Sequence, residues 1–295
     1  MKPKTNIVWL KRDLRLTDHA PLYEATSRDE QFLVLYIFEP AFMNDSHTDK
    51  RHWRFIQQSL SDIEKILAKQ KKQLSIAYGE ADHIFSELIN KYALANIFSH
   101  EETGLKLTFE RDKKLKKFFN VNKIQWHEYQ TNAVIRGLNN RKTWEKQWNK
   151  VMREEIKPIN LAKANIIFHP FIQSETPQLA NDVHHQTGGC LPAQKEIYDF
   201  FETRGQDYFK FISKPDKSRT SCSRLSPYIA YGNLSMREVY QTLLKSWNRP
   251  GWRRSMAALS SRLHWHCHFI QKYESEIEIE DLPINRGYEN FPYKV

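Results

Sequence analysis

Cysteine is scarce in this chain of 295 residues: Cys190, Cys222 and Cys267 are the only three, and none forms a CxxC pair. Neither a disulfide framework nor a thiolate zinc site is therefore indicated. Long apolar runs are also missing, since stretches such as 32–38 are too short to span a bilayer. Residues 1–6 lead into a predicted strand without the apolar core of a signal peptide. We therefore expect a soluble, cytoplasmic protein with no membrane partner.

Hydrophobic residues make up 40% of the chain, which is enough for two ordinary domains with their own cores. The formal net charge is +10, and it is unevenly distributed: residues 204–262 hold twelve basic and three acidic side chains. Aromatic residues lie among these basic groups, namely Tyr208, Phe209, Phe211, Trp247 and Trp252. This pattern is typical of a nucleic-acid surface, although a solvated basic face would show the same composition.

Strand and helix patterns alternate over residues 1–135. Short β-branched or aromatic runs predict strands at 6–9, 32–38, 74–78, 96–100 and 124–128. Amphipathic stretches predict helices at 18–27, 50–69, 83–92 and 108–119. This order predicts an α/β fold with a doubly wound parallel, Rossmann-like sheet. No GxGxxG follows the first strand, so the sequence does not indicate an ordinary dinucleotide-binding fold.

Periodicity fades between the two parts of the chain. Residues 136–192 form a predicted inter-domain segment, with one helix at 143–152 that carries Trp144 and Trp148. Everything with a pattern in 193–295 is helical, which predicts a second, all-α domain. The last long helix, predicted over residues 252–273, has two apolar stripes: Trp252, Met256, Leu259, Leu263, Ile270 and Tyr273 form one, and Ala258, Trp265 and Phe269 form the other. The segment 274–281 that follows is acidic and cannot cover the second stripe. We therefore expect this helical domain to be incomplete.

Two successive helix starts lie close together between Arg219 and Ser235. Ser226 and Pro227 are predicted as N-cap and first residue of one helix, and Gly232 as its stop. Ser235 to Glu238 has the pattern of a capping box that opens the next helix. Unpaired N–H groups beside arginines attract a diphosphate, so this segment is a candidate anion site. Two well-capped helices joined by a turn remain the alternative.

Three motifs, in the same order, resemble the DNA photolyase and cryptochrome family. The first is Val8–Asp18, the second runs from Ser223–Pro227 to Gly232–Ser235, and the third is Ser261–Gln271. The resemblance implies an α/β antenna domain at 1–135, followed by the first half of an FAD-binding helical domain at 193–295. Members of this family continue beyond the position of Val295, and no residue here is nominated as catalytic.

The resemblance also implies roles for individual residues. The FAD-binding candidates are Tyr208, Cys222, Ser223, Arg224, Leu225, Ser226, Arg262 and His266. Trp265 matches the tryptophan that borders flavin and lesion. Cys222 departs from the usual threonine, and Arg262 and His266 replace the commoner residues of that helix. Tyr208 could equally be a core tyrosine.

Two further candidates come from the same comparison and from spacing. Glu102 is the candidate for an antenna chromophore of the folate, deazaflavin or flavin type, the alternative being a surface carboxylate after a strand. His264 and His268 share a helix face near Cys267, which would suit a metal. They lack a general base and a fourth ligand at useful spacing, so no metal is predicted.

Three hypotheses follow from this resemblance. The first is light-driven repair of pyrimidine dimers in damaged DNA by electron transfer from reduced FAD, as in deoxyribodipyrimidine photo-lyases, by a chain that is monomeric when complete. The second is a cryptochrome-type blue-light photoreceptor without repair activity. The third is a chain with a folded α/β domain and no autonomous activity.

Overall fold

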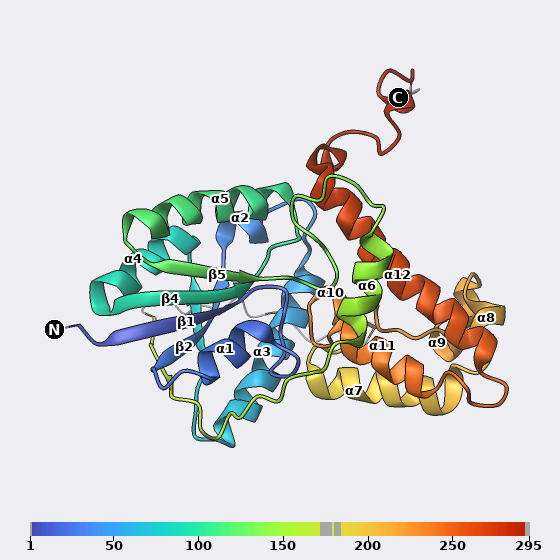
Figure 1. Cartoon of the computed structure of the whole chain (residues 1–295), viewed down its shortest axis with the longest axis horizontal. Helices are drawn as coiled ribbons and strands as arrows, with labels where there is room; N and C mark the ends of the chain where they lie inside the picture. The colour runs from blue at the N-terminus through green and yellow to red at the C-terminus, as the bar shows by residue number, and fades with distance from the viewer. Residues whose placement is uncertain (1, 172–178, 180–183, 293–295) are drawn as a thin grey trace.

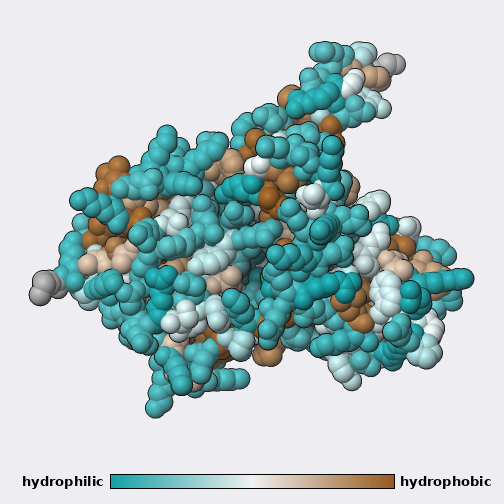
Figure 2. Space-filling view, in the orientation of Figure 1, coloured by the Kyte–Doolittle hydropathy of each residue, from teal (hydrophilic) through white to brown (hydrophobic). Residues whose placement is uncertain are grey.

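The computed structural model of the chain describes residues 2–171, 179 and 184–292. A parallel sheet with helices on both faces forms one end of the molecule, and a group of helices forms the other (Figure 1). The face seen in Figure 2 is mostly hydrophilic, with hydrophobic side chains in small scattered groups. None of the described helices combines the length and the apolar character that a membrane span needs.

The sheet confirms the predicted doubly wound fold. Its main strands run in parallel in the order β3-β2-β1-β4-β5. Their bounds are β1 Lys4–Leu10, β2 Phe32–Phe38, β3 Ser75–Tyr78, β4 Ala93–His100 and β5 Gln125–Tyr129. A further strand that the sequence did not predict, β6 (Ile166–Ile167), pairs with the first residues of β2. Because β1 covers the other edge of β2, β6 lies on the same edge as β3.

Helices cover both faces of the sheet because consecutive strand residues point to opposite sides. Val8 and Val34 pack on one side, while Ile7 and Leu35 pack on the other. The first side is covered by α1 (Ala20–Thr26) and α3 (Lys50–Ala68), and the second by α4 (Ala81–Lys91) and α5 (Lys106–Val121). A short α2 (Pro40–Met43) follows β2.

The helical part has its own core. Its elements are α6 Trp144–Arg153, α7 Cys190–Asp199, the π-helical turn η1 Phe200–Arg204, α8 Tyr208–Phe211, η2 Pro215–Lys217, α9 Ser218–Ser221, α10 Ser226–Ala230, α11 Met236–Lys245, α12 Arg253–Ser275, η3 Ile277–Glu280 and η4 Arg286–Tyr288. The predicted helix that carries Trp144 and Trp148 is α6, and both rings are buried in this core together with Leu259 and Leu263 of α12. The connecting helix therefore packs with the helical part.

The two parts meet where the loop after β1 contacts the turn after α10. The Leu14 N–H donates to the Tyr231 carbonyl at 3.0 Å, and the Asn233 amide donates to the Leu14 carbonyl at 2.9 Å. Gly232 has φ +70, and a Cβ there would lie 2.3 Å from the Arg12 carbonyl oxygen. Glycine is therefore required both by the left-handed backbone and by the close approach of the loop.

The long helix α12 has one covered and one open apolar stripe, as predicted. Met256, Leu259 and Leu263 are buried in the helical core. Trp265 and Phe269 are 51% and 54% exposed, so none of the described segments covers their side of the helix. The acidic segment that follows the helix does not lie over them.

Candidate functional site

The predicted cradle is the segment 221–226, which joins α9 to α10. Its backbone is held by Arg204, the last residue of the π-helical turn η1. The Arg204 side chain donates from Nε to the Cys222 carbonyl (3.0 Å) and from Nη2 to the Ser223 carbonyl (2.9 Å), and it also pairs with Glu196. Sequence reasoning missed Arg204, because an arginine that binds backbone carbonyls leaves no motif.

Arg224 shapes the middle of the cradle. Its backbone is left-handed, with φ +58, and its carbonyl accepts from the Gln186 side chain at 2.8 Å. Its guanidinium Nε lies 3.6 Å from a Glu196 carboxylate oxygen. The positive charge of Arg224, which was predicted to attract a diphosphate, is thus partly compensated by Glu196. Glu196 also pairs with Arg204.

The predicted N-cap at Ser226 is wrong by one residue. Leu225 is the N-cap of α10, and Ser226 is its exposed first residue. The reason is packing: Leu225 is 1% exposed in the helical core, and this burial sets where the helix begins. No side chain caps the helix, so its first N–H groups remain available to a ligand. The predicted stop at Gly232 and the capping box of Ser235 and Glu238 are both confirmed.

Tyr208 lies against the cradle from α8. It is 5% exposed and packs edge-to-face on Phe200. Burial and the neighbouring Cys222 thiol raise the pKa of Tyr208 to about 12, against the opposing charge of Arg262. The Tyr208 hydroxyl therefore stays protonated at neutral pH.

The α12 side of the cradle carries the remaining candidates. The Arg262 guanidinium stacks on the Trp265 ring at 4.8 Å. Burial lowers the pKa of His266 to about 4, so its ring is neutral at physiological pH. His266 Nδ1 is buried and has no hydrogen-bond partner among the described residues. A buried polar atom without a partner is costly, which makes it a natural contact for a bound polar group.

These residues fit a flavin dinucleotide. The uncapped start of α10 and the Tyr208 hydroxyl supply donors for phosphate, and His266 Nδ1 supplies an unsatisfied polar atom. The half-exposed Trp265 ring supplies a flat apolar surface.

The histidine-rich run 264–268 of α12 contacts tryptophan rings and an arginine. The His264 ring packs edge-to-face on Trp144 and Trp148, each at 4.9 Å between ring centres. His268 lies 3.1 Å from an Arg141 nitrogen, and Cys267 is fully buried in the helical core. A guanidinium beside His268 opposes the binding of a cation there.

Glu102 is buried rather than on the surface. It is 3% exposed, and its carboxylate pairs with Arg12 at 3.3 Å and with Arg111 at 3.1 Å. Arg111 also pairs with Glu39, so an ion-pair network occupies the carboxyl ends of β1 and β2. The cavity beside Glu102 measures about 20 Å³, which is room for a water molecule but not for a chromophore ring.

The predicted basic and aromatic face contains stacked pairs. Arg253 lies over Trp247 at 4.7 Å, and Arg254 and Lys210 both lie 5.6 Å from the Phe209 ring centre. Trp252 stacks with an arginine as well, but it is 3% exposed and faces the helical core. Phe209, Phe211 and Trp247 are partly buried, and Trp265 is half exposed, so the most accessible of these rings is Trp265.

Comparison with known proteins gives consistent results. The sequence pattern of the family described as DNA photolyase matches residues 6–160. The cryptochrome DASH of Synechocystis is 26% identical over 99% of this chain and 65% of its own length. An archaeal photolyase from Sulfolobus tokodaii, solved with two FAD molecules, superposes with a TM-score of 0.74 at 20% identity, over 98% of this chain and 64% of its own. A class III photolyase from Agrobacterium tumefaciens gives 0.77 at 18% identity, over 100% and 64%.

At these identities the superpositions show a shared fold. The chain spans just under two thirds of the length of these three proteins.

Proposed function

The chain belongs to the DNA photolyase family, and on this premise we propose that it is a flavoprotein that repairs pyrimidine dimers in DNA with light. The observation that carries the proposal is the buried, unpartnered Nδ1 of His266 on α12, the helix that also carries Arg262 and Trp265. Bound FAD would supply the absorption of blue light and, in its reduced form, the electron that splits the dimer.

The chain's own residues would hold and orient the cofactor. The cradle residues Cys222, Ser223, Leu225 and Ser226 would bind its phosphates and ribityl chain, with Arg224 beside them. Arg204 would keep the carbonyls of Cys222 and Ser223 occupied, so that they do not compete with a phosphate for the cradle's donors. Neutral His266 and protonated Tyr208 would act as hydrogen-bonding groups whose protonation does not change near neutral pH.

Damaged DNA would bind at the basic face of 204–262. Phosphates would contact arginines such as Arg253, and Trp265 would stack on a displaced base. The lesion has to leave the duplex stack before its reacting bonds can approach a buried cofactor. An exposed tryptophan on α12 next to the cradle suits that arrangement.

An antenna chromophore beside Glu102 is a separate proposal. It would have to displace Arg111, which fills this region through its pairs with Glu39 and Glu102. We therefore expect Arg111→Ala to increase the binding of an added flavin or folate at this end of the sheet. Unchanged binding by that variant would speak against Glu102 as an antenna ligand.

The first experiment is a spectrum of the chain after incubation with FAD and desalting. We expect a structured flavin absorption band, and Tyr208→Phe should weaken FAD binding by roughly fivefold through loss of one hydrogen bond. Tyr198→Phe, at a position 66% exposed on α7, is the matched control and should bind as the original chain does. A colourless protein would contradict the proposal that this chain binds FAD.

A cryptochrome-type photoreceptor is the second candidate. The unusual Arg262 and His266 on α12 support it, as does the similarity to a protein named cryptochrome DASH. Repair assays on a flavin-loaded chain separate the two candidates. Dimer repair that is lost in Trp265→Ala would exclude a purely sensory role, while flavin photoreduction without repair would favour it.

A further inference from the structure

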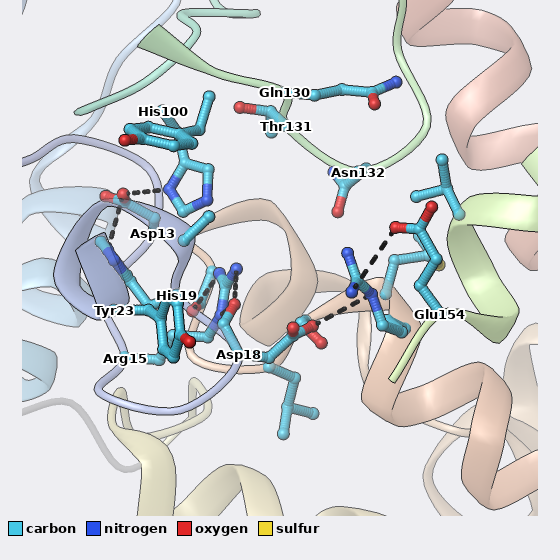
Figure 3. A pocket seen from close by; sticks show the side chains of 18 of the residues that line it. Asp13, Arg15, Asp18, His19, Tyr23, His100, Gln130, Thr131, Asn132 and Glu154 are labelled. Atoms are coloured by element: carbon cyan, nitrogen blue, oxygen red, sulfur yellow. Dashed lines mark hydrogen bonds and ion pairs between the residues drawn. The ribbon is translucent and has the colours of Figure 1, made fainter. Parts of the chain in front are cut away.

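A cavity of about 520 Å³ lies outside the cradle segment 221–226. It opens at the carboxyl ends of β1, β4 and β5 and is closed on its other side by residues of the helical part (Figure 3). In the strand order β3-β2-β1-β4-β5, the direction of winding reverses between β1 and β4. A crevice at this reversal is where doubly wound sheets bind ligands. Neither Glu102 nor any of the FAD-binding candidates lines it.

Arg15 is a buried cation in the wall of this cavity. It is 8% exposed, and its guanidinium donates to the carbonyls of Thr17 (3.1 Å), Asp18 (2.9 Å) and Gly232 (3.1 Å). All three acceptors are neutral, and no carboxylate of the described residues lies within ion-pair distance of it. These bonds use one N–H on each nitrogen, so each terminal nitrogen keeps one free donor.

His100 presents an acceptor to the same cavity. Its Nδ1 donates to the Asp13 carboxylate at 2.6 Å, and its side chain is 8% exposed. Burial lowers the pKa of His100 to about 4 even beside Asp13, so the ring is neutral. With the proton on Nδ1, the lone pair is on Nε2, which has no partner among the described residues. Figure 3 shows His100 at the edge of the cavity, with Asn132 reaching in from the opposite side.

Asp13, His19 and His100 are close enough to suggest a metal site, but a hydrogen bond argues against it. Their possible ligand atoms lie within 4.8 Å of one another. His19 Nδ1, however, accepts the Leu22 N–H at the start of α1, at 3.1 Å. In a neutral imidazole the proton must then be on Nε2, which faces Asp13 at 2.9 Å and cannot bind a metal. The cluster instead fixes His100 with its acceptor nitrogen toward the cavity.

The groups that remain free define the chemistry of a ligand. Arg15 offers two charge-assisted donors and lacks a counter-ion, which calls for an oxyanion. His100 Nε2 calls for a hydroxyl or N–H donor. The wall from the helical part is mixed: Met152, Leu234 and Met236 are apolar, whereas Arg237 is charged and already pairs with Asp18 and Glu154. We infer that this cavity binds a small organic oxyanion, either a carboxylate or a phosphate monoester, that carries a neighbouring hydrogen-bond donor.

Two matched pairs of probes test this inference by titration calorimetry of the full chain. Acetate and lactate differ by a hydroxyl on a carboxylate, and methyl phosphate and glycerol 3-phosphate differ by hydroxyls on a phosphate monoester. The hydroxylated member of at least one pair should bind more tightly than its partner. The pair that binds identifies the class of oxyanion. Failure of all four probes to bind more tightly than about 10 mM would overturn the inference.

Variants assign the binding to the named groups. Arg15→Lys should lower the affinity for every probe that binds by about tenfold, because a charge-assisted hydrogen bond is lost. His100→Asn should remove the advantage of the hydroxylated probe and leave its partner unchanged. Arg51→Lys makes the same change at an exposed arginine that pairs with Asp49. Neither Arg51 nor Asp49 lines the cavity, so this control should bind every probe as the original chain does. Equal affinities of Arg15→Lys and the original chain would contradict the inference.

A second variant covers the case in which Arg15→Lys does not fold. Asn132 has φ +52, so Asn132→Gly removes the amide from the cavity while suiting the backbone. The Asn132→Gly variant should keep the fold and lower the affinity for the probe by about fivefold. A properly folded Asn132→Gly with unchanged affinity would place the probe elsewhere and overturn the inference. The measurement needs neither flavin nor light.

Discussion

At the scale of single residues, Gly232 shows two separate requirements at one position. Its φ of +70 belongs to the left-handed region, and the Arg12 carbonyl and the Asp13 Cα lie where a Cβ would be. The atoms that a Cβ would meet belong to the backbone and not to a flexible side chain. A larger residue at position 232 would therefore have to displace the loop after β1. This loop also carries Arg15 and Asp13 into the cavity wall.

Gly232→Ala should therefore lower the free energy of unfolding by about 3 kcal/mol or more, combining backbone strain with displacement of the loop. Gly137→Ala is the matched control, because Gly137 has φ +69 but a Cβ added there would have no atom within 4 Å. It should cost only about 1 kcal/mol. Urea unfolding of both variants measures the difference. Equal losses would mean that close approach of the loop is unimportant.

Several residues were open to prediction from sequence and others were not. Gly232 could be recognised as a helix stop, because glycine after a helix is a local signal. Its contact with Arg12 depends on chain segments far apart in the sequence. Ser226 was misplaced because the burial of Leu225 decides where α10 begins. Arg15 and Arg204 act on backbone carbonyls, which no sequence pattern reveals.

At the scale of elements, α12 is a helix with one buried face and one open face. Leu263 is 4% exposed in the helical core, while Trp265, two residues later, is 51% exposed. The apolar periodicity of the sequence predicted both stripes. Which stripe is covered depends on the packing of α6, α8 and α11.

The two faces should respond differently to truncation. Leu263→Ala should lower the free energy of unfolding by about 2–4 kcal/mol, because it leaves a cavity in the core. Trp265→Ala should change it by no more than about 0.5 kcal/mol, since the ring is half exposed. Thermal or urea unfolding of the two variants provides the comparison. A large loss in Trp265→Ala would show that this ring is covered in solution, for example by a second copy.

Strands β1, β2 and β4 were predictable as short runs of mostly buried apolar residues, and β3 and β5 as short β-branched or aromatic runs that are less buried. The exception is β6, whose two residues carry no pattern of their own. Its pairing with Phe32 and Leu33 is set by the path of the connecting segment, so local sequence could not indicate it.

At the scale of the whole molecule, the pH dependence of stability should come from histidines whose pKa the fold lowers, most strongly His100 in the sheet part and His266 in the helical part. Burial lowers the pKa of both His100 and His266 to about 4, against about 6.5 in an unfolded chain. Between pH 6.5 and 4 the unfolded state therefore binds more protons than the folded state. Stability should fall over this window as the pH falls, by at most about 1.4 kcal/mol per pH unit for each histidine. Asp13, His19 and Arg15 surround His100, and Asp13 stays ionised throughout.

Urea unfolding at pH 7, 6 and 5 checks this dependence. His100→Asn should reduce the slope, because one group with a strongly lowered pKa no longer titrates. His266 and the less strongly shifted His52, His127 and His268 still contribute. His83→Asn is the control, because His83 is an exposed histidine of α4. That variant should leave the slope in place. An unchanged slope in His100→Asn would show that His100 is not buried and neutral in solution.

The path of the chain between the two parts has a final consequence. After β5 the chain enters the helical core as α6, returns to the sheet as β6, and then crosses again to α7. Each part is thus discontinuous in the sequence. The sheet includes β6, which follows α6 in the chain, and the helical core includes α6, which precedes β6. Any single cut between 136 and 192 would therefore leave the sheet without β6 or the helical core without Trp144 and Trp148.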